Sequence, residues 1–172
     1  MDESRVFRSA DARFGVSIPG REIATLLRFA RQTGNRETGG VLVGRYSETH
    51  DCAHITRISG PPRDSSGWRA NFHRGVSGVE RWLAKLWSAP QRTYYLGEWH
   101  FHPYASPEAS ATDAAQMRTI ATSAGYRCPE PLLLVLGGDP NGDWKLRAYV
   151  FPAGSTMVTM RDAVPEKEFE SS

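Results

Sequence analysis

The segment at residues 131–138, PLLLVLGG, limits the possible folds most tightly. It is apolar almost without interruption and only as long as a strand, which is typical of a strand buried on both faces. Residues 144–151 (WKLRAYVF) alternate between apolar and polar, and the Asp-Pro-Asn-Gly at 139–142 is a strong hairpin signal between the two segments. We therefore predict a mixed α/β (α+β) chain, with a mostly antiparallel mixed sheet flanked by helices.

Hydrophobic spacing predicts the other elements. Apolar residues recur at helical intervals in three segments, and we expect helices over residues 18–34, 76–87 and 112–124. Gly34 stands where the first helix would end, and Ser110 or Thr112 would cap the third. Further strands are expected over residues 41–46, 54–59, 68–72 and 93–99. Residues 60–67 (GPPRDSSG) form the clearest loop.

The size and charge of the chain bound its organisation and its partners. Its 172 residues, 40% of them hydrophobic, suit one compact domain. We place this domain at residues 18–152, after an N-terminal segment (1–17) and before a polar C-terminal tail (153–172) that we expect to be frayed. The formal net charge of +2, without a long basic run, argues against nucleic acid or an anionic membrane as a partner.

Features of a secreted or membrane protein are not found in the sequence. The first residues contain no apolar signal-peptide core, and no stretch approaches the roughly 18 apolar residues that span a bilayer. We therefore expect a cytoplasmic location, where Cys52 and Cys128 would be reduced structural thiols rather than a disulfide. Cys52 and His54 lie two residues apart, but the lack of a second ligand pair nearby argues against a metal site there.

The segment His100-Phe-His102-Pro103 carries the strongest chemical signal. Two histidines at positions i and i+2 of a strand project from the same face, and imidazole is a good zinc ligand. Pro103 ends the strand, and the ten residues up to Asp113 are enough for the chain to loop round and begin a helix. Asp113 in the first turn could then point back at the metal. Two histidines and one carboxylate leave a fourth position open for water, which marks a catalytic site.

A catalytic metal ion needs a base beside its water, and Glu37 is the best candidate. It stands just before the Thr-Gly-Gly at 38–40, which leads into the strand expected at 41–46. The glycines would allow close approach by the metal or by an extended substrate. Ser110, three residues before Asp113, could donate a hydrogen bond to the oxyanion of the reaction, and a helix cap is its competing role.

The spacing Glu…His-x-His-Pro-x6-Ser-x2-Asp resembles the JAMM motif of the JAB/MPN/Mov34 metalloprotease family. In this chain the six motif positions are Glu37, His100, His102, Pro103, Ser110 and Asp113. The resemblance covers about residues 18–152 and implies the MPN/JAB fold, which is cytidine-deaminase-like. It also implies one catalytic zinc ion with a bound water, held by His100, His102 and Asp113. Glu37 would then be the general acid/base, and Ser110 the hydroxyl that stabilises the oxyanion.

The segments ETGGVLVGRY and GEWHFHP are similar to the prokaryotic JAB branch, and more narrowly to the deconjugases of bacterial CBASS antiphage operons. This resemblance implies cleavage after the C-terminus of a conjugated ubiquitin-like or CD-NTase-type protein, and a link to an E1/E2-like ligase. Two alternatives stay open. One is a peptidase that matures the C-terminus of a ubiquitin-like or sulfur-carrier protein, and the other is an inactive MPN scaffold, although such scaffolds typically lack motif residues.

Several residues near the motif have less specific roles. Glu98 and Phe101 depart from the usual family residues, which bears on substrate preference. We expect Glu98 to face solvent on its strand. Trp99 alternates with the histidines, so it should point to the opposite face and pack beneath the site. His73 fits a loop histidine better than a groove residue, and the sequence assigns no substrate-binding residue and no role to residues 60–67.

Overall fold

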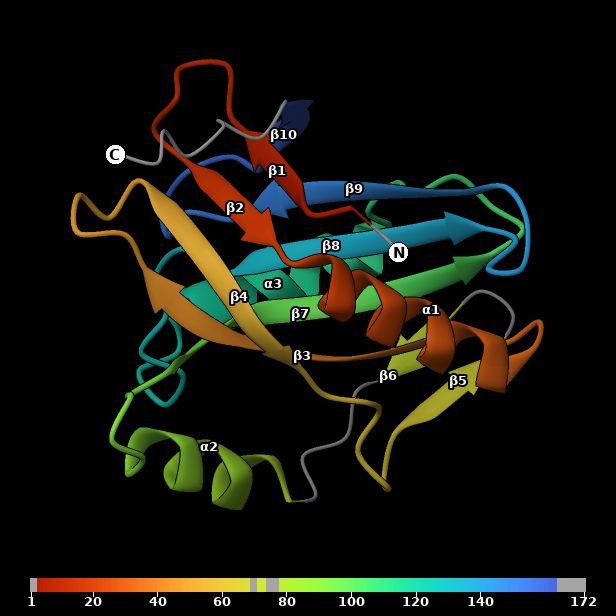
Figure 1. The fold of residues 1–172 in the computed structure, drawn as a ribbon, viewed down its shortest axis with the longest axis horizontal. Coiled ribbons are helices and arrows are strands. Elements are labelled where there is room, and N and C mark those ends of the chain that lie inside the picture. Colours follow the sequence, from red (N-terminus) through yellow and green to blue (C-terminus); the bar gives the residue numbers. More distant parts are fainter. Residues whose placement is uncertain (1–2, 69–70, 74–77, 164–172) are drawn as a thin grey trace, which may run out of the picture.

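A computed structural model describes residues 3–68, 71–73 and 78–163 of the chain. Eight of its strands close into a barrel (Figure 1). In spatial order they are β1 (Arg5–Arg8), β10 (Val158–Ala163), β9 (Trp144–Val150), β8 (Leu132–Gly138), β7 (Tyr94–Pro103), β3 (Thr38–Tyr46), β4 (Cys52–Ile58) and β2 (Gly15–Ile18). Strands β5 (Ser66–Trp68) and β6 (Asn71–His73) form a separate antiparallel pair. Within the barrel, β7 runs parallel to β8 and β2 runs parallel to β4, and the other neighbouring strands are antiparallel.

In the described part of the chain, three helices accompany the barrel: α1 (Gly20–Thr33), α2 (Val79–Trp87) and α3 (Ala111–Thr122). Figure 1 shows α1 in front of β7 and β8, with α3 behind them. The predicted α/β class and all three helices are confirmed, although residues 76–77 of the second predicted helix lie outside the described part. Gly34 lies at the C-cap of α1 and Ser110 at the N-cap of α3, as the sequence indicated.

The predicted central strand, β8, pairs on both sides. It runs parallel to β7 and forms the predicted hairpin with β9, in a register that joins Leu132 to Val150 and Gly138 to Trp144. Every residue of β8 except Gly138 is buried. Its alternate residues are buried in two different hydrophobic cores, Leu134 in one and Val135 in the other, which is why its sequence is continuously apolar rather than alternating.

The C-terminal tail was predicted to be frayed, and this is wrong for residues 158–163. These residues form β10, which pairs with β9 on one side and with β1 on the other. Met160 is buried and Val158 packs on the core, so the strand alternates despite its polar composition. Residues 164–172 lie outside the described part. The backbone of a polar segment is thus ordered by hydrogen bonds on both of its edges.

Strand β7 separates two hydrophobic cores. Trp99 and Phe101 are fully buried in the core on the α1 side. The other core lies on the α3 side and includes Met117 and Ile120 of that helix. Burying a large apolar side chain stabilises the fold by about 1.5–3 kcal/mol. The two aromatic residues therefore determine which face of β7 points to the α1 side and which points to the α3 side. The prediction that Trp99 packs away from the histidines is confirmed.

Two further sequence predictions concern the membrane and the cysteines. Among the described residues, no helix is long and apolar enough to cross a membrane. Cys52 and Cys128 are both free and buried, as expected for reduced structural thiols. Burial raises the pKa of the Cys128 thiol to about 11, so this sulfur stays protonated at neutral pH.

Gly40 lies against the core, where a side chain would not fit. A Cβ atom at this position would clash with the carbonyl oxygen of Ser59 and would lie 2.8 Å from Nε1 of Trp99. The indole N–H donates a hydrogen bond of 2.8 Å to the same carbonyl, and the ring stacks on Phe29 at 6.0 Å between centroids. Gly40 therefore makes room for Trp99 under the site, and the access that the glycines would give to a metal or a substrate stays a prediction.

Gly40→Ala should lower the free energy of unfolding by about 1–3 kcal/mol, because the added methyl group forces apart a packed backbone and an indole ring. Urea denaturation followed by tryptophan fluorescence measures this change. Gly125→Ala is the matched control, since a Cβ there meets only Ser123 Oγ at 3.7 Å, an ordinary contact distance. Equal stability of the two variants would contradict the proposed packing role of Gly40.

Candidate metal centre

Strand β7 presents His100 and His102 on one face because side chains alternate along a strand. Both imidazoles are buried, with exposed fractions of 1% and 7%. The strand is fixed by β3 on one edge and by β8 on the other, where His100 lies opposite Val135 and His102 opposite Gly137. The two histidines are therefore held on a central strand rather than on a mobile loop.

Helix α3 supplies the third member of the group. Asp113 is the third residue of this helix and is buried. Its backbone N–H donates to Ser110 Oγ at 3.0 Å, and its own carboxylate accepts from the Ser110 N–H at 2.8 Å. This reciprocal capping box fixes the first turn of the helix and the direction of the Asp113 side chain.

The loop between the histidines and the helix lies close against β8. A Cβ atom at Gly137 would meet the carbonyl oxygen of Ala105 at 2.5 Å and the nitrogen of Pro107 at 2.7 Å. Tyr149 of β9 donates a hydrogen bond of 3.0 Å from its hydroxyl to the carbonyl of Pro107. Only glycine allows this approach, and the approach brings the start of α3 to the histidines.

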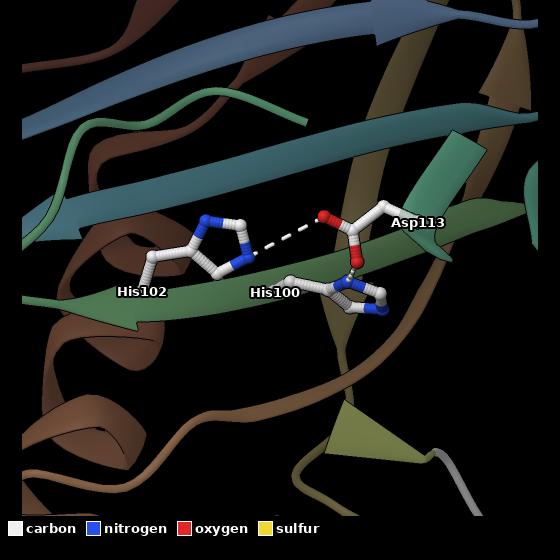
Figure 2. A group of neighbouring side chains, drawn as sticks. All are labelled: His100, His102 and Asp113. Atoms are coloured by element: carbon white, nitrogen blue, oxygen red, sulfur yellow. Dashed lines mark hydrogen bonds and ion pairs between the residues drawn. The ribbon is translucent and has the colours of Figure 1, made fainter. Parts of the chain in front are cut away.

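Figure 2 shows the Asp113 carboxylate between the two imidazole rings. One of its oxygens lies 2.7 Å from His100 Nδ1, and the other lies 3.4 Å from His102 Nε2. One ligand atom from each of the three residues lies within 4.8 Å of the others. The structure thus brings together the three residues that the sequence predicted as metal ligands.

The charges of the group support one another. Burial lowers the pKa of His100, but contacts with the Asp113 and Glu98 carboxylates outweigh burial and raise this pKa to about 9. Burial raises the pKa of Asp113, but hydrogen bonds to His100 and His102 outweigh that effect and hold the pKa well below its usual range. Asp113 is therefore a carboxylate at any physiological pH, with lone pairs available for a cation.

The donor set fits a metal ion of intermediate softness. Two imidazole nitrogens and one carboxylate oxygen are a typical set for zinc, and three protein ligands leave a position open for catalysis. Buried charged groups are costly unless they are paired or bind a metal ion. A metal ion held by His100, His102 and Asp113 would satisfy all three at once.

Glu37 lies next to this group, immediately before β3. The first pair of the β3–β7 ladder joins Thr38 to Phe101, which puts Glu37 beside His102. Its carboxyl group is half-buried and interacts electrostatically with His102, Asp113 and His100. Burial is the largest cause of its pKa shift and raises this pKa above the usual value for glutamate. A raised pKa suits a group that must both take up and release a proton.

Ser110 caps helix α3, which is one of its two predicted roles, and its role toward an oxyanion stays a prediction. Its Oγ accepts the Asp113 N–H, and the residue is exposed. A hydroxyl group can accept one hydrogen bond while donating another, so capping leaves the Ser110 hydrogen free to turn toward a substrate.

Glu98 is not solvent-facing, and this prediction is wrong. It is fully buried on the same face of β7 as the two histidines. Strand alternation, which identified the histidine pair, applies equally to a residue two positions earlier. The sequence interpretation missed Glu98 because it assigned the charge to solvent. The structure instead surrounds this carboxylate with Tyr95, His100 and Gln116.

His73 and the predicted loop at residues 60–67 were the two segments near the site with no assigned role. The side chain of His73 lies outside the described part of the chain. Gly60 and Pro62, from the predicted loop, line a cavity of about 330 Å³ together with Val79 and Trp82 of α2. The cavity adjoins Ser59, the residue whose carbonyl holds Trp99 beneath the histidines.

Comparisons with known proteins agree with this geometry. Residues 20–150 match the family of prokaryotic homologs of the JAB domain. A CD-NTase/cGAS isopeptidase of Enterobacter hormaechei is 39% identical over 158 residues, which are 92% of this chain and 87% of that protein. A probable metalloprotease of Sinorhizobium fredii is 30% identical over 135 residues, 77% of this chain and 81% of that protein. The solution structure of a protein from Desulfitobacterium hafniense has the same fold, with a TM-score of 0.54 at 17% identity, over 87% of this chain and 92% of that one.

Binding of zinc to the metal-free protein should become tighter as the pH rises toward about 9, the pKa of His100. Below that pH the imidazole carries a proton that the ion must displace, so affinity should rise about tenfold per pH unit if one proton is released. Calorimetry in buffers of different ionisation enthalpy measures the number of protons that the protein releases when it binds zinc. A pH-independent affinity between about pH 6.5 and pH 8.5 would contradict this account.

Proposed function

Because the chain belongs to the prokaryotic homologs of the JAB domain and is a metallopeptidase of the JAMM type, we propose that it is a zinc-dependent isopeptidase. Its substrate is a protein joined through its C-terminus to another group, and the enzyme hydrolyses the bond that follows this C-terminus. The observation that carries the proposal is the convergence of His100, His102 and Asp113 beside the half-buried Glu37.

In the proposed site, one nitrogen from each of His100 and His102 and one oxygen of Asp113 hold the zinc ion. A bound zinc ion supplies Lewis acidity, which makes water easier to deprotonate and polarises a carbonyl group. The remaining chemistry belongs to the protein. Because the strand and the capped helix turn fix all three ligands, binding requires little rearrangement of the site.

Glu37 acts as the general base and then as the general acid. Its carboxylate takes a proton from the attacking water and returns it to the departing amine, which is a lysine side chain for an isopeptide bond. Burial raises its pKa above that of an ordinary glutamate, which brings the carboxyl group closer to the proton affinity that both directions of transfer need. Ser110 donates its hydroxyl hydrogen to the oxyanion that develops on the scissile carbonyl. Water attacks directly, so no acyl-enzyme forms.

The conjugated protein is of the CD-NTase or ubiquitin-like class. The relatives from Enterobacter hormaechei and Pseudomonas aeruginosa are both CD-NTase/cGAS isopeptidases. By this proposal the chain reverses conjugation by an E1/E2-like ligase in bacterial antiphage defence and works in the cytoplasm. Its substrate tail ends in small residues, because a bulky side chain could not lie flat across the buried histidines.

Glu37→Gln should retain zinc and lose about 10²–10⁴-fold in turnover, because the amide cannot accept the proton of the water. His102→Ala should lose both zinc and activity, because it removes one of three ligands. Metal content by mass spectrometry and hydrolysis of a C-terminal lysine conjugate measure the two effects. Full activity of Glu37→Gln would remove Glu37 from the mechanism.

The same variant identifies the substrate. When Glu37→Gln is expressed in its native host with its neighbouring genes, a protein joined through its C-terminus to lysine should accumulate. Peptide mass spectrometry locates the bond, and added wild-type enzyme with zinc should remove it. Accumulation of an unprocessed C-terminal extension instead would replace the deconjugase with a maturation peptidase.

A further inference from the structure

The Glu98 carboxylate is a buried charge that the mechanism above does not use. It has no exposed surface and shares a face of β7 with His100 and His102. A buried carboxylate is costly unless its oxygens are hydrogen-bonded or paired with a cation. Its neighbours therefore indicate why the chain keeps an acid at this position.

Two neighbours fix the carboxylate in place. Tyr95 donates its hydroxyl hydrogen to Oε1 at 3.3 Å, and its ring packs against Tyr126 at 5.0 Å between centroids. Gln116 donates from Nε2 to the other oxygen, Oε2, at 2.9 Å. Because both oxygens are held, Glu98 has little freedom to rotate within the core.

The third neighbour is His100. Its Nε2 lies 3.5 Å from Glu98 Oε2, while its Nδ1 lies 2.7 Å from Asp113 Oδ1. The imidazole is thus placed between two buried carboxylates, one at each ring nitrogen. Figure 2 shows that one ring nitrogen of His100 points at Asp113 and the other points away from it.

Helix α3 organises both contacts. Asp113 and Gln116 are three residues apart on this helix, so they lie on the same side of it and face alternate residues of β7. Asp113 contacts His100, and Gln116 contacts Glu98. The same helix face therefore sets the position of the histidine and of the acid behind it.

We infer that Glu98 is a positioning residue for the metal centre: it faces Nε2 of His100, keeps the ring proton on that nitrogen, and so leaves the lone pair of Nδ1 for the metal ion. This inference rests on the proposed zinc site and deepens it. A carboxylate at the non-ligating nitrogen fixes the tautomer and the ring orientation of a histidine ligand and increases its basicity.

Glu98→Leu tests the inference, because leucine replaces the carboxylate with an apolar side chain of similar size and so removes the acceptor. Zinc affinity, measured by competition with a chromophoric chelator, should fall about 10–100-fold. Tyr95→Phe is the comparison variant: it removes the longer hydrogen bond, to Oε1, and leaves Gln116 to hold Oε2 against His100, so zinc affinity should fall by clearly less than in Glu98→Leu. Glu98→Gln, which restores an acceptor, should recover part of the loss.

A spectroscopic readout separates positioning from general destabilisation. In zinc-loaded wild-type protein, ¹⁵N chemical shifts should identify Nε2 of His100 as protonated and Nδ1 as the ligand. In Glu98→Leu, or in Glu98→Gln if the leucine variant does not fold, this pattern should weaken or shift to the other nitrogen. Unchanged zinc affinity with unchanged His100 shifts would overturn the inference and leave the proposed function intact. Failure of the wild-type protein to bind zinc through His100 would overturn both.

Discussion

The alternation of side chains along β7 is the constraint on which the rest of the molecule depends. Trp99 and Phe101 point into the core on the α1 side, and Glu98, His100 and His102 point to the α3 side. A shift of the strand by one residue would exchange these sets, placing three ionisable groups in an apolar core. The parallel pairing with β8, the bulged ladder with β3 and the hydrogen bond from Trp99 to Ser59 all hold this register. The aromatic residues that stabilise the fold therefore also orient the side chains of the site.

On the α3 side, the cost of burying charge is offset locally. Asp113 completes a capping box with Ser110 and also contacts both imidazoles, so one carboxylate starts the helix and joins it to the strand. Glu98 and Gln116 form a second contact between the same two elements. The buried acids and histidines thus support one another before any ion binds. In the proposed mechanism, this prior ordering keeps the cost of assembling the zinc site low.

The sequence predicted the features that depend on local periodicity. His100, His102 and Asp113 could be brought together because a strand repeats every two residues and a capped helix begins at a definable position. The same rule would have found Glu98, but its charge was assigned to solvent, and only the packing of α3 against β7 reveals its burial. The strand at Val158–Ala163 was missed because its own composition is polar. Its order comes from pairing with β9 and with β1, and β1 is distant in sequence. The role of Gly40 likewise depends on a contact across strands, with Trp99.

Diffraction from zinc-loaded crystals on either side of the zinc absorption edge tests the central claim most directly. We expect one anomalous peak, about 2.0–2.2 Å from a nitrogen of His100, a nitrogen of His102 and an oxygen of Asp113. Glu37 should face the same peak without binding the ion. A peak at another position, such as beside Cys52 and His54, or a zinc ion held without Asp113, would contradict the proposed site and the mechanism built on it.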